Sequence, residues 1–108
     1  MNFSVIKLQA PFERIKDSNK SSEIALRRAI ILQAIIDASN TSNNKQARII
    51  EQDAKKWLFS NSEYFQSICL EADLDPEFIV STAKKVIKLH NNKKEQVINE
   101  VIEEILYD

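Results

Sequence analysis

The sequence predicts an all-α protein of about five helices, with a helix-turn-helix at about residues 62–90. Three observations support this fold class. Apolar residues recur at helical spacing in several separate segments. The chain contains no glycine, which disfavours the tight Asn-Gly and Asp-Gly hairpins of β-rich folds. The dipeptide Asp75-Pro76 supplies a capping residue followed by proline, a strong helix start.

The elements follow one another without an evident linker or internal repeat, so we expect one helical domain over residues 21–108. Residues 1–20 are less regular and Pro11 interrupts them, so they are expected to form a partly irregular N-terminal arm. The first helix is expected over 23–38, after a serine cap at Ser21 or Ser22. It ends at a polar loop rich in Asn and Ser over 39–44.

The second helix is expected over 45–59, with one side formed by Ala47, Ile50, Ala54, Trp57 and Leu58. Ser60 precedes Glu63 by three residues, which suggests a capping box for a third helix over 62–72. The fourth helix is expected to begin at Pro76 and to run to Leu89 or His90. A fifth helix, over 93–107, carries an apolar stripe.

The segment 62–90 has the order that a helix-turn-helix requires. Cys69 is the small residue where the two helices cross, and Asp73 takes the left-handed turn position that glycine usually fills. The outward face of the second helix then presents a set of polar side chains. Lysines in such a helix contact phosphates, and residues near its start contact base edges. The predicted DNA-binding residues are Glu77, Ser81, Lys84, Lys85 and Lys88.

Positive charge is concentrated in one segment of the chain, so contacts with DNA are expected there and not over the whole protein surface. The formal net charge is −1, yet five lysines fall within 76–94 with Glu77 as the one acidic residue there. The acidic first turn of the helix, Asp75 and Glu77, also stabilises the helix dipole. Both explanations stay open for these carboxylates, and the lysines are equally compatible with a solvated face.

The apolar stripe of the last helix has two interpretations. In a monomer it covers the core; in a homodimer, two stripes pack on each other and place two recognition helices for paired half-sites. We expect a homodimer, with double-stranded DNA as the other partner. The interface residues are then Val97, Ile98, Val101, Ile102 and Ile105.

Enzyme and metal chemistry find little support in the sequence. Without glycine there is no phosphate-binding Gly-rich loop and no dinucleotide fingerprint. Cys69 and His90 are the only soft metal ligands, too few for a structural zinc site, so no metal, cofactor or catalytic residue is predicted. Cys69 is expected to be a packed small residue, and His90 to lie at a helix C-terminus. With no signal or membrane-spanning segment recognised, the cytoplasm is the expected location.

Part of the chain resembles a known group of proteins. The segments Ala54-Lys-Lys-Trp-Leu58 and Phe65-Gln-Ser-Ile-Cys-Leu-Glu-Ala-Asp-Leu-Asp-Pro76, with the upstream run 29–38, are similar to small uncharacterised helical proteins of bacterial and prophage genomes. The resemblance covers roughly 25–90 and departs at Asp73, where that pattern has glycine. It implies a compact, DNA-binding helical domain, but no binding residues.

The sequence therefore predicts a small, non-enzymatic helix-turn-helix transcriptional regulator of phage-related origin that binds DNA as a dimer. The alternative is a protein-interaction module that docks the stripe of helix 93–107 on itself or on a partner.

Overall fold

A computed structural model describes residues 22–107, and all its regular elements in that range are helices. They are α2 (Ser22–Ser39), α3 (Lys45–Phe59), α4 (Glu63–Glu71), α5 (Pro76–Ile87) and α6 (Asn91–Tyr107). The all-α prediction with about five helices is confirmed. The predicted arm over 1–20 lies outside the described residues.

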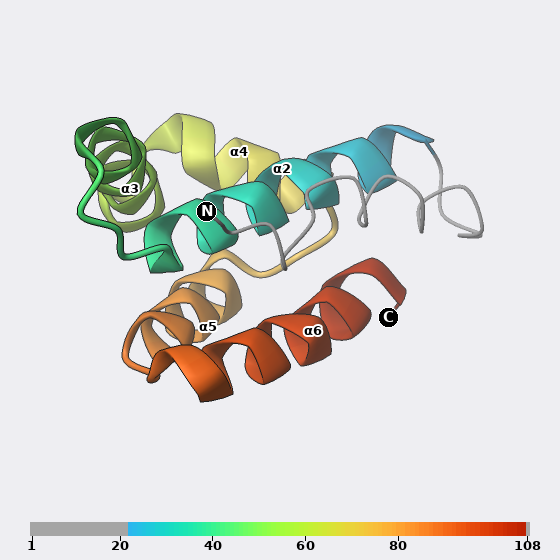
Figure 1. The fold of residues 1–108 in the computed structure, drawn as a ribbon. Helices are drawn as coiled ribbons and strands as arrows, with labels where there is room; N and C mark the ends of the chain where they lie inside the picture. The colour runs from blue at the N-terminus through green and yellow to red at the C-terminus, as the bar shows by residue number, and fades with distance from the viewer. Residues whose placement is uncertain (1–21, 108) are drawn as a thin grey trace.

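Helix α2 is the centre of the fold. Within residues 22–107 it contacts each of the other four helices, with α3 and α4 on one side and α5 and α6 on the other (Figure 1). A helix enclosed in this way needs apolar residues around most of its circumference. Its sequence provides them, since Ala25, Ala29, Ile31, Leu32, Ile35, Ile36 and Ala38 are all buried.

The remaining helices bury one face each against this centre. Leu58 of α3, Phe65 of α4 and Ile79 of α5 are almost inaccessible to solvent. The α6 stripe completes the core: Ile98, Val101, Ile102, Ile105 and Leu106 are buried, and Val97 is partly buried. This is the arrangement described above for a monomer.

The turn between α4 and α5 sets the direction of α5. Asp73 has φ 60°, the left-handed conformation expected at this position. The Asp73 N–H donates to the Leu70 carbonyl at 3.0 Å, and the Leu74 N–H donates to the Cys69 carbonyl at 2.9 Å. These two bonds form a Schellman motif, which ends α4 with aspartate in the position that glycine usually occupies.

Helix α5 then begins as predicted. The Asp75 side chain caps it by accepting a hydrogen bond from the Glu77 N–H at 3.1 Å, and Pro76 follows at the first helical position. Since proline has no N–H to leave unpaired there, the start of α5 is fixed at this point in the chain.

Buried Arg28 braces the same turn from α2. Its Nε donates to the Ala72 carbonyl at 2.7 Å and its Nη2 donates to the Asp73 carbonyl at 3.3 Å. Its Nη1 donates to the Ile105 carbonyl at 2.6 Å, in the last turn of α6. One guanidinium therefore satisfies carbonyl groups at the ends of two helices. Carbonyl groups at such positions have no hydrogen-bond partner within their own helix.

Several details differ from the sequence expectations. Ser62, rather than Ser60, caps α4, since its side chain accepts from the Phe65 N–H at 3.1 Å. Helix α5 ends at Ile87, short of Leu89 or His90, and the His90 carbonyl instead accepts from the Lys94 N–H at the start of α6. Ile50, expected on the buried side of α3, is 49% exposed because α2 covers only part of that helix.

Candidate nucleic-acid interface

All five predicted DNA-contacting side chains lie on the accessible face of α5. Glu77 and Ser81 occupy its first half, and Lys84 and Lys85 its last turn. Lys88 caps the helix C-terminus through its backbone and is also exposed. The opposite face holds Ile79, Ala83 and Val86, which are completely buried. The core therefore fixes which side of α5 faces outward.

The lysines of this face are not neutralised within the described chain. Over residues 22–107, no carboxylate lies within ion-pairing distance of Lys84, Lys85 or Lys88. Ion pairs between Arg27 and Glu71 and between Lys55 and Glu51 lie elsewhere in the molecule. Positive charge near a helix C-terminus is favoured by the helix dipole, which accounts for the presence of Lys84 and Lys85 without any ligand.

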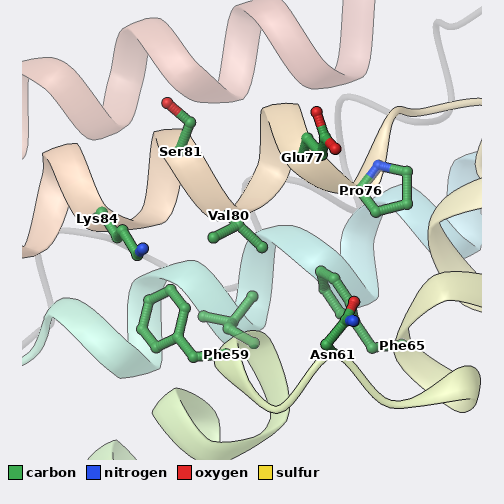
Figure 2. A pocket seen from close by; sticks show the side chains of 9 residues that line it. Phe59, Asn61, Phe65, Pro76, Glu77, Val80, Ser81 and Lys84 are labelled. Carbon is green, nitrogen blue, oxygen red and sulfur yellow. The ribbon is translucent and has the colours of Figure 1, made fainter.

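Lys84 differs from its neighbours in what it contacts. Its Nζ lies 5.9 Å from the centroid of the Phe59 ring, which is 37% exposed at the end of α3. Figure 2 shows the ammonium group directed toward this ring. The separation fits a cation–π contact. Lys85 and Lys88 have no such partner in the described part of the chain.

A hollow of about 460 Å³ lies between α5 and the corner that joins α3 to α4. Its apolar walls are Leu58, Phe59, Phe65, Pro76 and Val80, and its polar groups are Asn61, Glu77, Ser81 and Lys84 (Figure 2). Asn61 at the corner has φ 57°, and its Oδ1 accepts a hydrogen bond from Gln66 Nε2 at 2.9 Å. The predicted DNA-contacting face thus borders a cavity.

Two of the residues that line this hollow were not predicted from the sequence as part of the site. Phe59 and Asn61 belong to a different helix and corner from α5, and nothing local to either position indicates that it meets residues 76–84. The sequence did favour apolar packing for the neighbouring Trp57, and this is observed. Its ring is partly buried and meets Phe65 edge-to-face, with centroids 5.0 Å apart.

A second hollow, of about 530 Å³, lies across α2 and α3, and its charged lining residues are both acidic. Ile30, Ile50 and Trp57 contribute apolar surface, and Asp37 and Asp53 are its charged groups. Burial raises the pKa of the Asp37 carboxyl above its ordinary value, and a hydrogen bond from Gln33 opposes that change. This hollow is unsuited to a polyanion.

The structure also gives the surroundings of Cys69 and the placement of possible metal ligands. Cys69 is a free, buried thiol, as expected for a packed small residue; burial and then the charge of Asp75 raise its pKa to about 11. A thiol in that state is not a nucleophile near neutral pH. Within residues 22–107, no group of three or more His, Cys, Asp and Glu side chains is arranged to hold a metal ion.

The five expected interface residues of α6 are placed inside the molecule. Ile98, Val101, Ile102 and Ile105 are 6% exposed or less, and Val97 is partly buried. In this arrangement they pack on α2 and α5 and are not presented to a second copy or another partner.

Comparison of the chain with protein-family models, curated proteins and solved structures gave no match. The resemblance to helical prophage proteins therefore stays a prediction. Among the described helices, none combines the length and apolar character needed to cross a membrane.

Proposed function

We propose that this protein binds double-stranded DNA through the exposed face of α5 and acts as a small transcriptional regulator. The observation that supports this most is the set of three lysines, Lys84, Lys85 and Lys88, which face solvent without a carboxylate partner in the described chain. A duplex presents regularly spaced phosphates that such side chains neutralise, with release of counterions.

The arrangement of α4, its turn and α5 supports the same proposal. A helix-turn-helix places its second helix in the major groove and uses the start of that helix on bases. In this assignment Lys85 and Lys88 contact phosphates. Ser81 contacts a base edge or the backbone, and Glu77 accepts from a cytosine amino group.

The proposal does not include pairing through the stripe of α6, because those side chains already pack in the chain's own core. The same observation disfavours an interaction module built on that stripe. A location in the cytoplasm and a phage-related origin stay predictions from the sequence.

A charge-reversal pair tests the proposal. Lys85→Glu with Lys88→Glu alters the α5 face, and Lys45→Glu with Arg48→Glu makes the same change in charge on the exposed start of α3. Fluorescence anisotropy of a labelled mixed-sequence duplex at low salt measures binding. We expect the α5 variant to bind at least about tenfold more weakly than the α3 variant, since two phosphate contacts are replaced by repulsion.

Circular dichroism of both variants checks that they keep their helical content. Absence of wild-type binding at low salt would refute the proposal. Equal weakening by the two variants would show a nonspecific effect of net charge, and would remove α5 as the binding surface.

A further inference from the structure

The hollow beside α5 has the composition of a small-molecule site. Its volume of about 460 Å³ falls within the usual range for such pockets, and five of its nine lining residues are apolar. Pockets of this kind bind the body of a ligand through apolar contacts and orient it through a few polar groups. The polar groups here come from α5 and from the corner after α3.

The charges of the hollow are separated along α5. Lys84 lies at one end beside Phe59, whereas Glu77 and Pro76 lie at the other (Figure 2). Glu77 and Lys84 are two helical turns apart, about 10 Å along the axis. A negative group at the lysine end would therefore meet the ammonium group well away from the carboxylate.

Lys84 is available for such a group. Its Nζ has the face of the Phe59 ring at 5.9 Å and no carboxylate at ion-pairing distance in the part of the chain described. An apolar body in the hollow would cover the exposed surface of Phe59 and Val80 and exclude water from around the ammonium group. Because removal of water strengthens attraction between opposite charges, the apolar and ionic contacts support one another.

We propose that this hollow binds a small molecule with an apolar body and a single anionic group, a carboxylate or sulfonate, paired with Lys84. Glu77, Ser81 and Lys84 line the hollow and also belong to the proposed DNA-contacting face. Occupancy therefore competes with DNA, which makes the ligand an effector; this second part rests on the proposed function, whereas the binding itself does not.

The test uses anilinonaphthalenesulfonate, a fluorescent probe with an apolar body and one sulfonate, and the full chain without DNA. Lys84→Ala removes the proposed partner of the anion. Lys85→Ala removes the same charge from the next residue, which does not line the hollow. We expect Lys84→Ala to weaken probe binding at least about tenfold and Lys85→Ala to change it less than about twofold.

Displacement experiments test the chemistry of the ligand. Octanoate should displace the probe, whereas octanamide, with the same chain and no charge, should not. Equal binding by the two lysine variants, or equal displacement by the two compounds, would overturn the site. Ile50→Ala alters the acidic hollow between α2 and α3. Loss of probe binding in that variant would place the probe there and would also overturn the proposal.

Octanoate added to the complex of the protein with labelled duplex tests the competition. The apparent Kd for DNA should rise with octanoate concentration in wild type and stay constant in Lys84→Ala. An unchanged Kd in wild type would overturn the effector role while leaving the binding site. If wild type binds the probe but not DNA, the proposed function and the effector role fail, and the ligand site stands on the probe measurements alone.

Discussion

Two groups of positive side chains have opposite environments in this molecule. Arg28 and Lys94 are 4% and 7% exposed, whereas Lys84, Lys85 and Lys88 face solvent. The buried pair binds backbone carbonyls at helix ends: Arg28 those of Ala72, Asp73 and Ile105, and Lys94 that of Ser39 at 2.8 Å. The amino-acid composition does not distinguish these five residues, but of the five only the three exposed lysines are accessible to a polyanion.

The difference shows why a positively charged side chain can be buried in this fold. Helices end with carbonyl groups that lack partners, and a buried donor that satisfies them offsets part of the cost of its own desolvation. In this molecule the ends of α2, α4 and α6 are joined to other helices in this way. If the two groups have separate roles, substitutions in the buried pair should alter stability and substitutions in the exposed lysines should alter binding.

The largest effect is expected for Arg28→Met. This change leaves carbonyls at the ends of α4 and α6 without their charged donor, so the free energy of unfolding should fall by about 3 kcal/mol. Urea denaturation followed by circular dichroism measures it. Arg27→Met is the control, since Arg27 makes an exposed ion pair with Glu71 and should cost about 1 kcal/mol or less. Equal losses would contradict the assignment of Arg28 as a brace.

Lys94→Met should lower the free energy of unfolding by about 2 kcal/mol at neutral pH, because the end of α2 loses the donor to the Ser39 carbonyl. Urea denaturation provides the measurement, and exposed Lys93→Met is the control. A loss as large in the Lys93 variant would show that the carbonyl contact is not the cause.

The burial of Lys94 also leads us to expect a pH dependence of the folding stability. Burial lowers the pKa of its ammonium group in the folded protein, opposed by the charge of Glu51. The charged form is thus disfavoured on folding, and the unfolded chain holds more protons at pH values between the lowered pKa and the ordinary lysine pKa of 10.5. Across that window, the stability of wild type relative to Lys94→Met should rise with pH. A relative stability that falls would contradict the direction of this pKa shift.

Asp73→Gly should have a smaller effect, of opposite sign. Asp73 has φ 60°, and a left-handed residue with a Cβ costs roughly 1 kcal/mol relative to glycine. The variant should therefore unfold at a higher urea concentration, by an amount that corresponds to about 1 kcal/mol or less once the flexibility of glycine in the unfolded chain is included. A clear loss of stability would indicate that the aspartate side chain itself holds the turn.

The sequence predicted the features that depend on neighbouring residues. Asp75 and Pro76 mark the start of α5 because capping and the missing N–H act within a few positions. The left-handed turn at Asp73 and the outward direction of the α5 lysines followed from the same local pattern.

Features that depend on distant residues were not predicted. The burial of Arg28 and Lys94 was not predicted, because their carbonyl partners lie 44 to 77 residues away in the chain. Phe59 and Lys84 meet only after α3 and α5 have packed. The exposure of Ile50 has the same origin, because helical periodicity identifies an apolar face but does not show how much of it a neighbour covers.

The salt dependence of DNA binding tests the central claim most directly. The log–log slope of the binding constant against salt concentration is measured for wild type, for Lys85→Ala with Lys88→Ala, and for Lys45→Ala with Arg48→Ala. If the exposed lysines of α5 contact phosphates, the Lys85/Lys88 variant should reduce the magnitude of the slope by about 1.8. The Lys45/Arg48 variant should leave the slope near the wild-type value. Identical slopes for all three proteins would contradict the account.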